Sequence, residues 1–106
     1  MNHALALNPK MAEAWVHRGV VWFAKQDLTR AIADYDQALK LNPRLAGAYC
    51  GRGVTWLAQS KPAEAEADFA RCRSLGGSPK PDAEMLLREM KSQIDANLQL
   101  KVRDGF

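Results

Sequence analysis

The sequence lacks long apolar runs and blocks of like charge. No hydrophobic stretch approaches the roughly 20 residues that a helix needs to cross a bilayer, so we expect no membrane span. The 15 Lys and Arg and the 12 Asp and Glu are spread along the chain. No segment therefore concentrates the charge that would attract nucleic acid or anionic lipid. We expect neither a nucleic-acid partner nor a membrane.

Cysteine and histidine are also scarce. The two cysteines fall in separate helical patterns, which suggests no disulfide and weakly indicates a reducing compartment. The N-terminus lacks the basic and apolar segments of a signal peptide, so a cytoplasmic location is the default expectation. His3 and His17 are not at ligand spacing, and neither cysteine has a Cys-x-x-Cys neighbour. We predict no metal and no cofactor.

The 106 residues have the length and composition of a single folded domain, and they repeat themselves. Shifting the chain by 34 residues aligns two consecutive segments with 11 identities in 34 positions. The pattern Ala-Leu-x-Leu-Asn-Pro occurs at residues 4–9 and again at 38–43, so part of a further unit precedes the two complete ones. A fixed period of this length is typical of helical repeat proteins.

Within each unit the apolar residues recur at intervals of three and four, as they do along one face of a helix. Asp27 is a plausible N-cap, and Asn42-Pro43 a plausible helix stop. We predict helices at about 12–25, 28–41, 46–59 and 62–75, paired as antiparallel hairpins.

The run AEAWVHRGVVWFAKQDLTRAIADYDQALKLNP closely resembles the tetratricopeptide repeat (TPR), and AGAYCGRGVTWLAQSKPAEAEADFARCRSL is a looser second copy. The resemblance covers about residues 4–77. It implies an all-α superhelix, a TPR solenoid. We divide the single domain 1–106 into the tail of a truncated repeat (1–11), two complete repeats (12–45 and 46–79) and a capping helix with its tail (80–106).

The resemblance assigns packing roles to several residues. Gly19, Ala31, Gly53 and Ala65 would let paired helices approach closely, beside the aromatic residues Trp15, Tyr35, Tyr49 and Phe69. It also places Arg18 with Asp34, and Arg52 with Asp68, on facing helices. We therefore predict a salt bridge within each hairpin.

The sequence departs from the family pattern at the loops and at its C-terminal end. Gln26 and Ser60 stand where the loop glycine is usual, and Gly77 replaces the usual terminal proline. From Asp82 to about Val102 we predict a fifth helix, which caps the last hairpin. Its apolar stripe consists of Ala83, Leu87, Met90, Ile94 and Leu98.

The first helix of each pair carries more apolar surface than its packing needs. The large apolar residues around Val20 span roughly 160°, whereas one buried face takes about 100°. In the family these helices line a concave groove. Its predicted protein-binding residues here are Glu13, Val16, His17, Val20, Phe23, Ala24, Cys50, Val54, Leu57 and Ala58, with Gly47 and Gly51 between them. Members that clamp the C-terminal carboxylate of a chaperone tail carry polar and basic residues there, so we do not expect such a clamp.

The sequence favours a non-catalytic module or scaffold that binds an apolar or amphipathic peptide or helix of a partner protein. The alternative is a structural module that forms a homo-oligomer through its uncovered N-terminal edge or its groove. No base, nucleophile and orienting group can be named together, so we do not expect an enzyme. Cys72 is interpreted as a small buried hydrophobic residue, while Cys50 could be a reactive thiol. Whether the capping helix enters the groove stays open.

Overall fold

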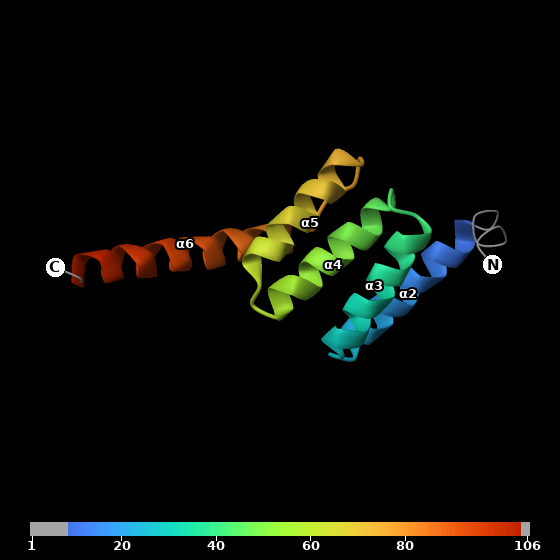
Figure 1. Cartoon of the computed structure of the whole chain (residues 1–106), viewed down its shortest axis with the longest axis horizontal. Coiled ribbons are helices and arrows are strands. Elements are labelled where there is room, and N and C mark those ends of the chain that lie inside the picture. The colour runs from blue at the N-terminus through green and yellow to red at the C-terminus, as the bar shows by residue number, and fades with distance from the viewer. Residues whose placement is uncertain (1–8, 105–106) are drawn as a thin grey trace.

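The chain folds as an all-α helical repeat solenoid (Figure 1). The computed structural model describes the backbone of residues 9–104 and the side chains of residues 10–96. Its helices are α2 (Pro9–Ala24), α3 (Leu28–Leu41), α4 (Ala46–Ala58), α5 (Pro62–Ser74) and α6 (Pro81–Asp104). No strand occurs among the described residues. Residues 1–8 of the predicted truncated repeat (1–11), among them His3, lie outside them.

The predicted helix boundaries agree with the observed ones to within about one residue, except at the start of α2 and near the end of α6. Asp27 is the N-cap of α3, since its carboxylate accepts the backbone N–H of Arg30 at 3.1 Å. The α3 helix ends at Leu41, before Asn42-Pro43, as the sequence indicates. The α2 helix begins at Pro9, three residues earlier than predicted, because proline is tolerated in a first helical turn.

Glycines bring the two helices of each hairpin close together, as the small and large positions of the repeat suggest. A Cβ on Gly19 of α2 would lie 2.9 Å from Cε1 of Tyr35 in α3. In the second hairpin, a Cβ on Gly53 of α4 would lie 2.6 Å from Cε1 of Phe69 in α5. Each aromatic ring therefore fills the space that the missing side chain leaves.

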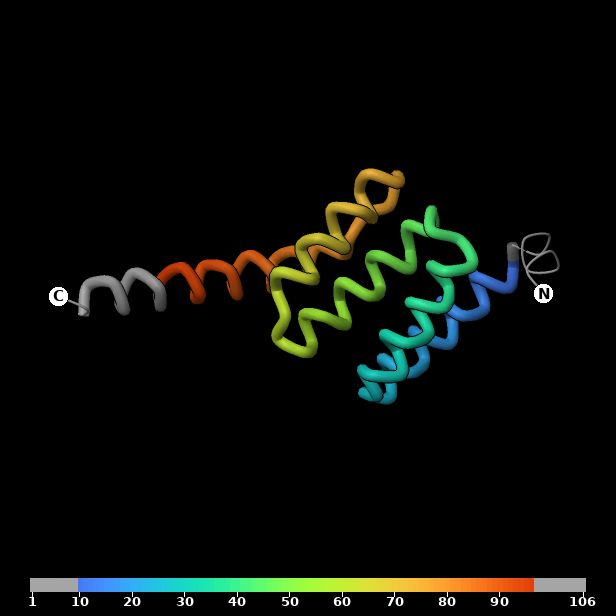
Figure 2. The backbone as a smooth tube through the Cα atoms, viewed as in Figure 1, coloured from blue at the N-terminus to red at the C-terminus, as the bar shows by residue number. Residues whose placement is uncertain are grey.

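The hairpins α2–α3 and α4–α5 stack side by side, as the backbone trace in Figure 2 shows. The α4 helix contacts both α3 and α2, so the first helices of the two repeats are neighbours. Among residues 9–104, no second helix layer covers one face of α2 and α4. The candidate site lies on that face.

The first half of α6 closes the last hairpin, and the rest extends away from the body (Figure 1). Ala83 and Leu87 are buried with Leu57 and Phe69, and Met90 packs against the same cluster. Farther along the predicted stripe Ile94 is 44% exposed, and the side chain of Leu98 lies outside the described residues. The helix therefore caps α4 and α5 with its first three turns. No described helix is long and apolar enough to span a membrane.

Candidate functional site: an apolar groove along α2 and α4

Two adjoining apolar hollows run along the uncovered face of α2 and α4. The first encloses about 270 Å³ and the second about 240 Å³, and both are lined by Phe23, Val54 and Lys80. The remaining lining of the first hollow is Val20, Tyr35, Gly47, Cys50, Gly51 and Ser78, and that of the second is Leu57, Ala58, Asp82, Ala83 and Leu86. We call the two hollows together the groove.

The structure brings six of the ten predicted protein-binding residues together, with Gly47 and Gly51 between them. The six are Val20, Phe23, Cys50, Val54, Leu57 and Ala58. Val20 stands on the rim with 51% of its surface exposed, whereas Leu57 lies at the floor with 4%. Glu13, Val16, His17 and Ala24 of α2 line neither hollow. The groove is thus shorter on its α2 side than the family pattern implies.

Sequence reasoning did not assign several groove residues. Tyr35 belongs to α3, yet it reaches the first hollow because Gly51 has no side chain to cover it: a Cβ there would lie 2.7 Å from Cζ of Tyr35. Burial, with a smaller contribution from the neighbouring Asp34 carboxylate, raises the pKa of the Tyr35 phenol to about 12. The buried ring therefore stays neutral in the groove wall over the physiological range.

The connection between α5 and α6 completes the groove at its far end. Ser78 and Lys80 line the first hollow, while Asp82 and Leu86 of α6 line the second. The first turns of α6 thus form an end wall, and the rest of the helix extends away from the body (Figure 1). The repeat pattern gives no signal for Lys80, Asp82 and Leu86, because they follow its last unit, and Ser78 lies at the divergent end of that unit.

The two cysteines form a disulfide, so the expectation of no disulfide was wrong. Cys50 of α4 and Cys72 of α5 have Cα atoms 5.4 Å apart, within the usual range for a bridge. Cys72 is buried, as expected, but as half of a disulfide, and Cys50 is not a free thiol. Because disulfides are rare in reducing compartments, the weak indication of such a compartment no longer holds.

The antiparallel geometry of the hairpin explains the disulfide. Gly53 lies opposite Phe69. Three residues back from Gly53 is Cys50, and three residues forward from Phe69 is Cys72. Three residues are about one helical turn, so in antiparallel helices the two cysteines meet as the next pair. The predicted antiparallel hairpin of residues 46–59 and 62–75 was therefore the signal that could have revealed it, because it places the two cysteines on facing helices.

An ion pair to a buried carboxylate joins the two helices of each hairpin, as predicted. Asp34 accepts hydrogen bonds from Arg18 Nε at 2.7 Å and from Nη2 at 3.0 Å. Asp68 accepts the same two bonds from Arg52, at 2.8 and 2.9 Å. Arg52 also donates to Asp36 of α3 at 2.8 Å, and this contact joins the two repeats. These carboxylates raise the pKa of both guanidinium groups, mainly through the hydrogen bonds.

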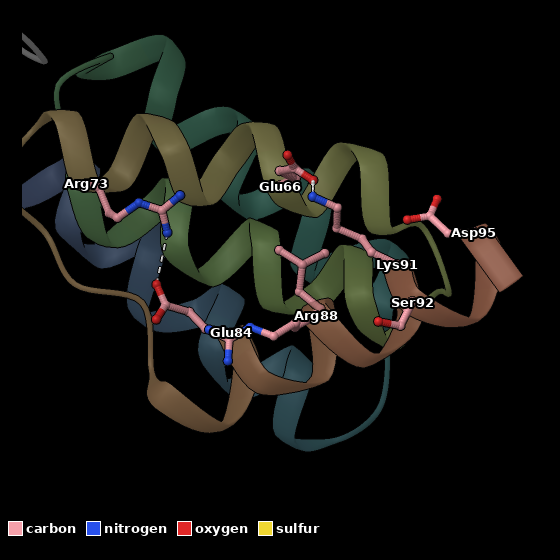
Figure 3. A pocket seen from close by; sticks show the side chains of 8 residues that line it. Glu66, Arg73, Glu84, Arg88, Lys91, Ser92 and Asp95 are labelled. Carbon is pink, nitrogen blue, oxygen red and sulfur yellow. Dashed lines mark hydrogen bonds and ion pairs between the residues drawn. The ribbon is translucent and has the colours of Figure 1, made fainter.

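A third hollow, of about 440 Å³, lies between α5 and α6 and is lined mainly by charged residues (Figure 3). Arg73 donates to Glu84 at 2.9 Å, and Lys91 to Glu66 at 2.6 Å. These four side chains are a third to a half exposed, so each pair contributes about 1 kcal/mol or less. We interpret the pairs as braces between α5 and α6.

The opposite side of α2 carries a smaller hollow. It encloses about 190 Å³ and is lined by Met11, Ala14, Trp15 and Arg18. Met11 and Val21 are 37% and 49% exposed. This is the N-terminal edge at which the sequence predicts an uncovered surface.

Two comparisons with known proteins bear on these surfaces. A protein-family model described as a TPR repeat matches residues 21–60. The match runs from the end of α2 through α3 and α4 into the following loop. No curated protein matches the chain.

Proposed function

The chain contains a tetratricopeptide repeat, and from this premise we propose that it is a non-catalytic module that binds an apolar or amphipathic segment of a partner protein in the groove. Repeats of this family are generally protein-interaction modules without catalytic activity. The observation that carries the proposal is the pair of adjoining apolar hollows along α2 and α4.

The dimensions of the groove support a peptide rather than a flat protein surface. Each hollow has the volume to hold one or two large side chains, and exposed apolar surface of this kind usually marks an interaction site. A partner helix would direct its apolar side chains into the hollows while its polar face stays in water. Val20, Phe23 and Val54 would provide most of the contact area, above the buried Leu57.

The groove favours apolar side chains over a terminal carboxylate. Lys80 is the one basic residue in the lining of the two hollows. A single lysine gives an anionic terminus few donors to replace the water it would lose. The geometry is therefore consistent with the expectation that this is not a chaperone-tail clamp.

The test replaces Val20 and Val54 with glutamate and measures capture of partner proteins by the purified chain. We expect the double variant to lose the captured proteins, because each glutamate places a charge in an apolar hollow. The matched control is Ala67→Glu with Ala70→Glu, which adds the same charge at exposed positions of α5. Circular dichroism verifies that both variants stay helical. Undiminished capture by the groove variant would refute the proposal.

The second candidate function is self-association through the N-terminal edge of α2. The observation that favours it is the hollow beside Met11 and Trp15, which no described residue covers, and the exposed Val21 nearby. Light scattering over a dilution series tests it. We expect a dimer that dissociates on dilution. The double substitution Met11→Glu with Val21→Glu should abolish this dimer. A monomer at every concentration would eliminate this candidate.

A further inference from the structure

The disulfide opens into the groove on one side only. Cys50 lies in the wall of the first hollow, together with Val20 and Val54. Cys72 is 1% exposed and lines none of the hollows described above. Gly77 packs directly over it, since a Cβ there would lie 2.6 Å from Cys72 Sγ. The S–S bond therefore runs from the groove wall into the interface between α4 and α5.

The first repeat shows that the hairpin does not require this disulfide. The positions equivalent to Cys50 and Cys72, 34 residues earlier, are Val16 and Ala38, yet α2 and α3 pair in the same manner. In the second repeat, the Arg52–Asp68 pair and the contact of Phe69 with Gly53 also join α4 to α5. We therefore expect the second hairpin to survive reduction.

We propose that Cys50–Cys72 is a reversible redox site and that Cys50, once reduced, is a modification site in the groove for uncharged, apolar thiol-reactive molecules. The reductant is a dithiol. One of its thiolates attacks Sγ of Cys50, the cysteine that lines the hollow, and Cys72 leaves as a thiolate that takes a proton. The second thiol of the reductant then displaces Cys50, also as a thiolate that takes a proton. The products are two cysteine thiols and the oxidised dithiol, with two electrons transferred.

An uncharged electrophilic alkene, of which N-ethylmaleimide is an example, then reacts with the Cys50 thiolate. The sulfur bonds to one alkene carbon, the C=C bond becomes a single bond and the other carbon takes up a proton, so no group leaves. The surroundings of Cys50 favour this class of molecule. The walls of the first hollow are largely apolar, so an uncharged reagent enters without losing the hydration of a charge. An adduct on Cys50 occupies part of the roughly 270 Å³ of this hollow. This consequence rests on the proposed function: modification of Cys50 blocks the groove, whereas the disulfide leaves it open.

The experiment reduces the native chain with dithiothreitol, labels it with N-ethylmaleimide and locates the label by peptide mass spectrometry. We expect Cys50 to react at least tenfold faster than Cys72 while circular dichroism stays unchanged. In guanidinium chloride the two rates should become similar, since burial no longer protects Cys72. Similar rates in the native chain, faster labelling of Cys72, or loss of helicity on reduction would each overturn the proposal.

Two further measurements separate this inference from the proposed function. The Cys72→Ser variant leaves Cys50 as the one thiol. Its Cys50 should react with N-ethylmaleimide at the same rate as Cys50 of the reduced wild type, and a rate tenfold slower would contradict the assignment. The labelled chain should bind the uncharged apolar dye Nile red severalfold more weakly than the disulfide form, and unchanged dye binding would refute blocking. If Cys50 labels selectively but the Val20 and Val54 variant still captures its partners, the redox site stands and the proposed function fails.

Discussion

The two hairpins contain the same ion pair in different surroundings, so the chain carries its own control for the contribution of a buried carboxylate. Asp68 is 1% exposed and accepts hydrogen bonds from both Arg52 and Arg71, and also from Trp56 Nε1 at 2.9 Å. Asp34 is 5% exposed and accepts two bonds, both from Arg18. The equivalent tryptophan, Trp22, has a buried Nε1 with no hydrogen-bond partner among the described residues.

The perturbation is Asp→Asn at each position, which removes the charge and leaves the volume almost unchanged. At Asp68 the amide NH₂ faces N–H donors, and Arg52, only 19% exposed, loses its most buried counterion. Breaking such a pair costs about 3–5 kcal/mol, and we take the lower end because Arg52 keeps its bond to Asp36. At Asp34 the partner Arg18 is 58% exposed and water can replace the lost bonds, so we expect about 1–2 kcal/mol.

The assay is urea unfolding followed by circular dichroism, with the free energy of unfolding compared among the wild type, Asp34→Asn and Asp68→Asn. We expect Asp68→Asn to cost at least 1 kcal/mol more than Asp34→Asn. Equal losses, or a larger loss at Asp34, would refute the reasoning that burial and the number of donors determine the contribution of each pair. Because the two sites occupy the same position of the repeat, helix propensity cancels in the comparison.

Two further predictions follow from the backbone and from the groove. Ser60 has a φ of 61°, in the left-handed region, so Ser60→Gly should raise the free energy of unfolding in urea by up to about 1 kcal/mol, and a loss of stability would contradict this. The raised pKa of Tyr35 predicts a pH dependence of the free energy of unfolding. The contribution of Tyr35 is fully present below pH 10 and decreases by about 2–3 kcal/mol between about pH 10 and 12, because the phenol of the unfolded chain loses its proton at a lower pH. Urea unfolding at pH 9 and 11.5 measures this loss, and the prediction fails if Tyr35→Phe shows the same loss.

Pairing within a hairpin could be predicted from the sequence because it depends on local spacing. The intervals of three and four fix which face of each helix is apolar, and the 34-residue shift identifies the equivalent positions in the two repeats. The family resemblance then indicated which residues pack between the paired helices, and that Arg18 faces Asp34 and Arg52 faces Asp68, as they do in the structure. The disulfide lies within the second predicted hairpin, but the expectation considered only that the two cysteines lie in separate helices.

The far end of the groove could not be predicted in the same way. Lys80 and Leu86 lie after the last complete repeat, where no earlier copy indicates their position, and Ser78 lies at the end of that repeat, where it departs from the family pattern. Their place depends on how the α5–α6 connection leaves the hairpin and on the angle at which α6 packs against α4 and α5. The shortness of the groove on its α2 side has a similar origin, because exposure there depends on neighbouring helices.

The sequence by itself determined the helices, the hairpin register and the repeat, because each of these depends on contacts between residues close in sequence or related by the 34-residue period. Only the tertiary structure decided which apolar residues enclose a hollow, which sulfur faces it, and how Asp34 and Asp68 come to differ. The physical reason is that burial is a collective property. It depends on every helix that packs against a residue, and identical positions in two repeats have different neighbours.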